Sequence, residues 1–121
     1  MKSYDLEERT SAFSEEIIDF VQKLPRNPIN NPLVSQIVRS ATSIGANYAE
    51  ACQTLTTKDL SNKLVICKKE ANETKYWLRM ISRANKNYSE NCRTLWRKAH
   101  EFVLMFSKGV SSTQKNLNLK P

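Results

Sequence analysis

The sequence predicts an all-α protein folded as an up-down-up-down antiparallel four-helix bundle. Apolar residues recur at alternating spacings of three and four over residues 6–24, 34–55, 60–81 and 88–106, which is the pattern of helices that bury one face. The 121 residues contain only 2 glycines and 4 prolines, so few turns interrupt the chain. Short connections between long helices favour antiparallel neighbours, which predicts the up-down-up-down order.

Residues with capping or helix-breaking properties stand at the boundaries of these segments. Pro25 ends the first helix because it lacks an amide proton and disfavours a helical residue before it, and Gly109 is expected to stop the fourth. We therefore expect a four-helix bundle domain over residues 1–109 and a flexible polar tail over residues 110–121. Capping residues are expected to open the first three helices: Asp5 with Glu8, Asn31 before Pro32, and Thr56 with Asp59.

The composition argues against several classes of protein. No uncharged stretch approaches the ~18 apolar residues that span a bilayer, and the first residues lack the apolar run of a signal peptide. The three cysteines, Cys52, Cys67 and Cys92, are widely spaced and form no CxxC pair, which argues against disulfides and zinc. We expect them to be small core residues in a soluble protein of the cytoplasm.

Polar residues form a second stripe, one residue away from the apolar seam, on the second and third segments. Inward carboxylates in a bundle can indicate a di-metal site, but such sites use ExxH motifs, and the single histidine, His100, stands in none. No nucleophile is placed near the carboxylates, so we expect no metal, no cofactor and no catalytic residue. The predicted alternative is a structural network of ion pairs and hydrogen bonds formed by Arg9, Arg39, Asn47, Glu50, Glu70 and Glu73.

Gly45 lies in the middle of the second segment among small residues. A glycine there destabilises the helix by roughly 1 kcal/mol relative to alanine, but it lets another helix approach closely. The sequence leaves open whether that helix belongs to the same chain or to another subunit.

Charge is unevenly distributed around a net charge of +7. Residues 5–24 hold six acidic and two basic side chains, whereas residues 58–98 hold eleven basic and four acidic ones. Rows of lysine and arginine along one helix face suit phosphates, although such a face can also be a solvated surface. Tyr76 within the row can stack on a base or pack on the bundle, and the lack of other large apolar residues disfavours a membrane surface. The candidate nucleic-acid-binding residues are Lys68, Lys69, Lys75, Tyr76, Arg79, Arg83, Lys86, Arg93 and Arg97.

Three runs of sequence resemble a known bacterial family: DLEERTSAF at residues 5–13, QIVRSATSIGANYAEA at 36–51 and KDLSNKLVICKKEANETKYWL at 58–78. The chain resembles the four-helix bundle proteins first noticed as products of intervening sequences in 23S ribosomal RNA genes, a family also labelled ribosomal-protein-like. The resemblance covers roughly residues 4–107. It implies a ring-like homopentamer and similarity to the accessory protein of diversity-generating retroelements, a basic pentamer that binds nucleic acid and a reverse transcriptase. It implies no catalytic residue, because the family has no established activity.

Together these observations predict a cytoplasmic, non-enzymatic accessory protein that forms a homo-oligomer, with a pentamer expected, and binds RNA or DNA through a basic helix face. The alternative is a scaffold that recruits a protein partner, such as a polymerase, without touching nucleic acid. Strong salt dependence of polynucleotide binding would distinguish the two.

Overall fold

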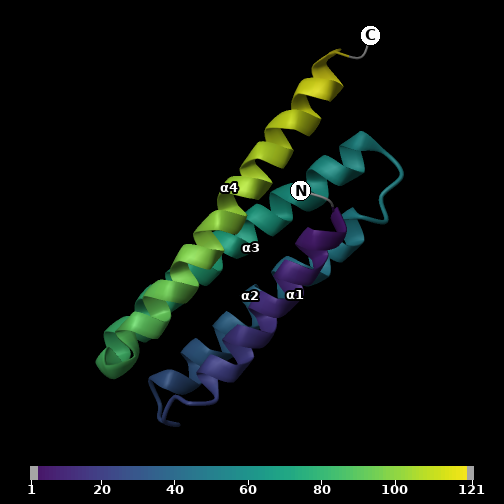
Figure 1. The fold of residues 1–121 in the computed structure, drawn as a ribbon. Helices are drawn as coiled ribbons and strands as arrows, with labels where there is room; N and C mark the ends of the chain where they lie inside the picture. Colours follow the sequence, from purple (N-terminus) through teal and green to yellow (C-terminus); the bar gives the residue numbers. More distant parts are fainter. Residues whose placement is uncertain (1–2, 120–121) are drawn as a thin grey trace.

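The computed structural model describes residues 3–119, with side chains from residue 5 to residue 118. Four helices and one short 3-10 turn make up this part of the chain: α1 (Ser3–Val21), α2 (Asn30–Ala51), α3 (Thr57–Ala84), η1 (Lys86–Tyr88) and α4 (Ser89–Leu119). Successive helices run in opposite directions, with α1 beside α2 and α3 beside α4 (Figure 1). No strand occurs within the described residues, and the all-α four-helix bundle is confirmed.

The predicted apolar stripes form one continuous core. Helix α3 packs against both α2 and α4, whereas α1 lies mainly on α2. Phe13 of α1 meets Phe102 of α4 edge-on, with ring centroids 5.4 Å apart. Each large side chain buried in this way contributes about 1.5–3 kcal/mol through removal of apolar surface from water. The stripe residues with almost no exposed surface are Phe13, Ile17, Ile37, Ile44, Leu78, Ile81 and Phe106.

Gly45 meets a helix of its own chain. A β-carbon at this position would lie 3.6 Å from Cβ of Thr10 on α1, which is an ordinary contact distance. Packing between α1 and α2 therefore accounts for the small residue without a second subunit.

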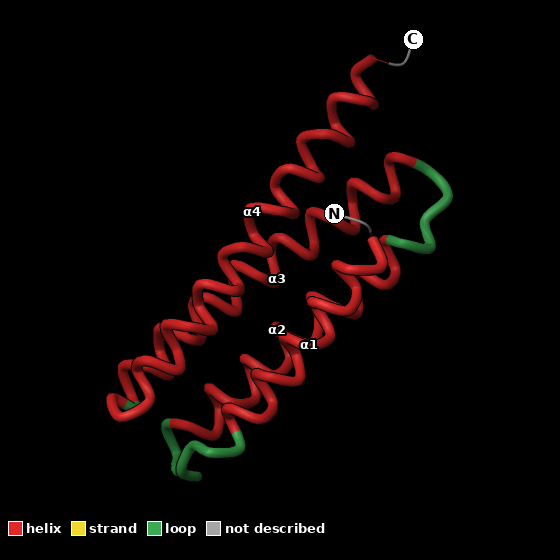
Figure 2. The backbone as a smooth tube through the Cα atoms, in the orientation of Figure 1, coloured by secondary structure: helices red, strands yellow, loops and turns green. Residues whose placement is uncertain are grey.

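Two buried asparagines join the loops at one end of the bundle. Asn30 Nδ2 donates to Asn85 Oδ1 and Asn85 Nδ2 donates to Asn30 Oδ1, both at 2.8 Å. Their remaining amide protons bond the carbonyls of Pro25 and Ile81. Because unpaired buried amides are costly, this pair ties the α1–α2 loop to the α3–α4 junction, which lies at the same end (Figure 2).

The helix starts agree only partly with the sequence. Thr56 Oγ1 accepts from the Asp59 amide at 3.1 Å, so that cap is confirmed. Helix α2 begins one residue before Asn31, and the side chain of Asn27 accepts from the amides of residues 29 and 30 instead, at 3.0 and 2.7 Å. Asp5 lies inside the first turn of α1, because that helix begins at Ser3. These two expected caps are therefore wrong.

The expected stop of the fourth helix at Gly109 is also wrong. Helix α4 continues through it to Leu119, and its end extends past the start of α3 (Figure 1). The apolar spacing continues as well, because Val110 packs on the core and Thr113 is only 6% exposed. Residues 110–119 are thus helical. Whether this helical end is mobile in solution stays a prediction, and Lys120 and Pro121 lie outside the described residues.

Two further core assignments differ from the expectation. Cys67 and Cys92 are buried as expected, whereas Cys52 is exposed. Leu55 continues the periodic pattern of α2 but is 97% exposed, because the helix ends at Ala51. No helix in the described part of the chain is long and apolar enough to cross a membrane.

Candidate nucleic-acid interface

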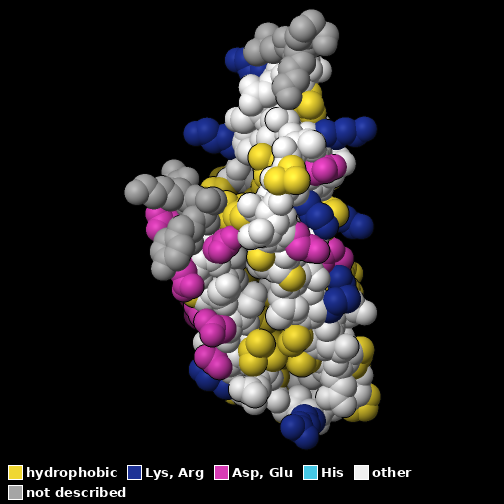
Figure 3. Space-filling view, turned by 90° about the vertical axis from the view of Figure 1, so that its right-hand side faces the viewer, with side chains coloured by type: hydrophobic (Ala, Val, Ile, Leu, Met, Phe, Trp, Pro, Cys, Tyr) yellow, Lys and Arg dark blue, Asp and Glu magenta, His cyan; other side chains and the backbone are white. Residues whose placement is uncertain are grey.

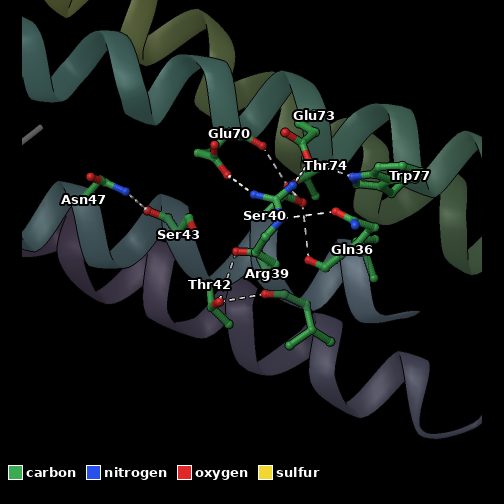
Figure 4. A network of polar contacts seen from close by, with 12 residues as sticks. Gln36, Arg39, Ser40, Thr42, Ser43, Asn47, Glu70, Glu73, Thr74 and Trp77 are labelled. Carbon is green, nitrogen blue, oxygen red and sulfur yellow. Dashed lines mark hydrogen bonds and ion pairs between the residues drawn. The ribbon is translucent and has the colours of Figure 1, made fainter. Parts of the chain in front are cut away.

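The polar stripes of α2 and α3 meet at Arg39 (Figure 4). Arg39 Nη1 lies 3.1 Å from Glu70 Oε2, and Arg39 Nη2 forms a second ion pair with Glu73. Trp77 Nε1 donates to Glu73 Oε2 at 2.9 Å, and Arg39 Nε donates to Gln36. The side chain of Glu70 is only 11% exposed, so this carboxylate depends on the guanidinium to offset its loss of water.

A buried hydroxyl pair continues this contact toward the core. The hydroxyls of Ser40 and Thr74 lie 2.9 Å apart, and Thr74 donates to the Glu70 carbonyl at 2.9 Å. Every buried side-chain nitrogen and oxygen in the described residues has a hydrogen-bond partner. The cluster therefore fits a role in fixing α2 against α3.

Three of the six predicted network residues lie elsewhere. Arg9 Nη2 lies 3.1 Å from Glu101 on α4, because α1 turns that face toward α4. Glu50 pairs with Lys63 at 3.3 Å in an exposed position. Asn47 donates to the Ser43 carbonyl on its own helix at 2.8 Å (Figure 4). The structure thus brings together Arg39, Glu70 and Glu73 only.

Most of the predicted basic residues carry uncompensated charge. Six of them make no hydrogen bond or ion pair to any residue that the structure describes, and five of these six are exposed, with Lys68 half-buried. They lie on two adjacent helices, α3 and α4, or in the turn between them. This set, called the basic surface below, consists of Lys68, Lys69, Arg79, Arg83, Lys86 and Arg97.

The other three candidates have partners within the chain. Arg93 forms an ion pair with Glu90, one turn earlier on α4. Tyr76 is 52% exposed and packs edge-on against Trp77, with ring centroids 5.0 Å apart. Lys75, one of the basic residues expected in a row along one helix face, is half-buried and contacts His100 of α4.

Lys75 points to two α4 residues that were not predicted from the sequence as part of the site. Its Nζ lies 3.0 Å from His100 Nδ1 and 4.5 Å from the ring centroid of Trp96. The Trp96 and His100 rings stack 5.1 Å apart, at 18°. Trp96 and His100 stand four residues apart and are interleaved with Arg93 and Arg97, and this spacing is the signal in the sequence that points to them.

The opposite charge gathers on α1. Asp5, Glu8, Glu15, Glu16 and Asp19 are all exposed, and Figure 3 shows a column of acidic side chains running down one edge of the molecule. Glu16 is paired with Lys98 of α4 at 2.7 Å. The charge segregation expected from the sequence is therefore present in part: exposed acidic groups gather on α1 and the basic surface lies on α3 and α4, where Glu90 and Glu101 are exposed as well.

The buried thiols are poor nucleophiles. Burial raises the pKa of Cys67 to about 12 and that of Cys92 to about 11. Burial, followed by the Glu7 carboxylate, also raises the pKa of the exposed Cys52. Since the thiolate is the reactive form, none of the three is activated.

The fold and the surface define a helical-bundle protein with a basic surface over two neighbouring helices. The chain belongs to the family of 23S rRNA-intervening sequence proteins, whose family model matches residues 2–108. It is also similar to a crystal structure of a protein of unknown function from the S23 ribosomal protein family of Bacteroides thetaiotaomicron. That structure has 32% sequence identity and a TM-score of 0.82, over 92% of this chain and 99% of the other. No curated protein matches the chain.

Proposed function

We propose that this protein is a non-enzymatic, homo-oligomeric accessory protein that binds RNA or DNA through the basic surface of α3 and α4. The observation that supports this is the set of six cations without partners among the described residues. Uncompensated cations on adjacent helices attract phosphates, and binding releases counterions from the polynucleotide. We place this activity in the bacterial cytoplasm, where an exposed thiol such as Cys52 stays reduced.

Phosphate contacts position a polynucleotide without reading its sequence, so binding through the basic surface should be largely sequence-tolerant. If the protein assembles into a ring, each subunit repeats the surface, and weak contacts on one strand combine. The family name adds a context of ribosomal RNA genes, but the proposal rests on the charges.

A charge-reversal experiment tests the basic surface. Lys69→Glu with Arg83→Glu changes two exposed residues and should weaken binding of a fluorescent RNA or DNA strand at least tenfold at ~50 mM salt, where electrostatic attraction is strong. The slope of log affinity against log salt should fall by about one unit for each phosphate that the variant no longer neutralises. Lys23→Glu with Arg26→Glu is the matched control, because it makes the same charge change on exposed residues near the end of α1.

Equal weakening by both double variants would indicate a response to net charge alone and would reject the basic surface as the site. No binding by the unaltered protein at ~50 mM salt, where even non-specific binding is strong, would reject nucleic-acid binding as a whole.

A protein-recruiting scaffold is the second candidate, and exposed apolar residues favour it. Val65, Ile66 and Tyr76 of α3 and Leu104 of α4 are 45%, 37%, 52% and 57% exposed. Where such side chains adjoin one another, they are suited to a protein interface. Capture of a polymerase or another protein that persists at high salt, without polynucleotide binding, would support this candidate instead.

A further inference from the structure

A small hollow opens between α3 and α4 beside Trp96. Its volume is about 210 Å³. Leu78 and Cys92, both almost fully buried, form the apolar floor, and the indole of Trp96 forms one wall. Arg79 of α3 and Arg93 of α4 also line it, one from each helix.

Two residues that do not line the hollow, His100 of α4 and Lys75 of α3, hold the Trp96 ring in place. His100 stacks on it with ring centroids 5.1 Å apart, and Lys75 Nζ lies 4.5 Å from its centroid. A fixed aromatic ring loses little conformational freedom when a second flat ring packs on it. Trp96 as a residue is 37% exposed and lines the hollow, so part of its surface is open to a ligand.

The chemistry around the hollow combines flat apolar contact with positive charge. Arg79 is exposed and has no partner among the described residues. Arg93 pairs with Glu90, but the two side chains are 54% and 82% exposed, and exposed ion pairs are weak enough for a phosphate to compete. Ser82 and Ser89 add hydroxyls at the lining, 3.2 Å apart, which can bond the edge of a polar ring.

We propose that this hollow receives one unstacked nucleobase, which packs on Trp96 while Arg79 and Arg93 hold the flanking phosphate. The volume favours a single ring system, because sites for larger ligands usually span about 300–1,000 Å³. An apolar peptide side chain fits the floor but leaves both arginines unused. The inference rests on the proposed function and adds to it a preference for single strands, since a base in a duplex cannot reach the hollow.

Trp96 itself provides the readout. The chain contains 2 tryptophans, so the Trp77→Phe variant leaves Trp96 as the single source of tryptophan fluorescence. A single-stranded oligothymidylate should quench that fluorescence, whereas an abasic strand of the same length should not. Base stacking on an aromatic side chain strengthens binding by roughly tenfold, so the abasic strand and a duplex of equal length should bind about tenfold more weakly than the oligothymidylate.

Two variants separate the hollow from the basic surface. Trp96→Leu removes the stacking wall, and Ser82→Leu fills the hollow from a half-buried position without removing a core residue. Each should lower affinity for the oligothymidylate to that of the abasic strand and leave abasic binding unchanged. Circular dichroism checks that both variants are folded. If Trp96→Leu is unfolded, the result for Ser82→Leu alone tests the hollow as a base site.

Equal affinity for the normal and abasic strands, without quenching, overturns the hollow as a base site and leaves the proposed phosphate binding intact. Absence of binding to every strand at ~50 mM salt, where phosphate attraction is strong, overturns both.

Discussion

Arg39 lies between two carboxylates that α3 places three residues apart. Glu70 and Glu73 are neighbours on one helix face, where like charges repel, and the guanidinium of α2 pairs with both. Removing it would leave Glu70 shielded from water and facing a second negative charge. The contribution of Arg39 to stability should therefore lie between that of a surface ion pair and that of a fully buried one.

Arg39→Ala should lower the free energy of unfolding by about 1–3 kcal/mol, because it leaves a nearly buried carboxylate without its partner. Urea unfolding monitored by circular dichroism measures the change. Lys63→Ala is the matched control, since it removes a cation from the exposed pair with Glu50 and should change stability by about 0–1 kcal/mol. Equal effects of the two variants would show that Arg39 holds no special place.

The buried thiols predict loss of stability in alkali. Burial raises the pKa of Cys67 from 9.0 to about 12 and that of Cys92 from 9.0 to about 11. Above pH ~9 the unfolded chain releases thiol protons that the folded chain retains. The contribution of the two thiols to the free energy of unfolding is therefore complete below pH ~9. It is lost as the pH rises toward their pKa values in the folded protein, by at most ~1.4 kcal/mol per pH unit for each thiol.

Unfolding free energies at about pH 8, 9 and 10 measure this decline. Cys67→Ala lowers stability at every pH because it leaves a cavity, but it should make the decline shallower by removing one of the two groups. A decline as steep as that of the unaltered protein would show that other groups, not Cys67, control the alkaline transition.

At the scale of elements, the apolar stripes were predictable because packing inside a bundle follows the helical repeat. The predictions that were wrong concern positions whose surroundings depend on more than that repeat. Leu55 fits the stripe of α2 but lies beyond the end of the helix. Lys75 shares the spacing of the outer residues of α3, yet α4 covers that flank and places His100 against it.

The candidate site likewise has features that the sequence predicts and features that only packing creates. Its charges could be listed from the sequence, because exposed lysines and arginines need no tertiary partner. The pair of Arg93 with Glu90 follows from their spacing of three residues on one helix. The contact of Lys75 with His100 could not be predicted in that way, because it forms only where α3 packs on α4. The hollow beside Trp96 was equally out of reach, because it arises from residues of two helices that only packing brings together.

The last turns of α4 carry a prediction of their own. Deleting residues 110–121 removes Val110 and Thr113, whose side chains contact the core or are buried. We expect a loss of about 1–3 kcal/mol in unfolding free energy, the range for burying side chains of this size. Deleting residues 118–121 is the control and should change stability by no more than ~0.5 kcal/mol. If both deletions are neutral, the segment is the mobile tail that its composition predicts.

At the scale of the whole molecule, a single chain leaves both charged and apolar side chains exposed at its surface. Exposed acidic residues gather on α1 and the basic surface lies on other helices, α3 and α4, so two copies can present opposite charges to each other. Exposed apolar residues on the outside of α3, Val65, Ile66 and Tyr76, add surface that water solvates poorly. Both features favour association of copies.

We therefore predict a homo-oligomer at micromolar concentration, and the family resemblance makes a pentamer the expected number. Native mass spectrometry and light scattering measure the number of chains directly. Repeating the measurement at low and high salt separates the two sources of association, because contacts between exposed charges are screened over about 10 Å at 0.1 M salt, whereas apolar contacts are not. An assembly that dissociates in salt would require the basic surface to be shared between subunit contacts and nucleic acid, and polynucleotide should then compete with assembly. An assembly that persists leaves the surface free in every subunit, and a clean monomer at both salt concentrations would contradict the prediction.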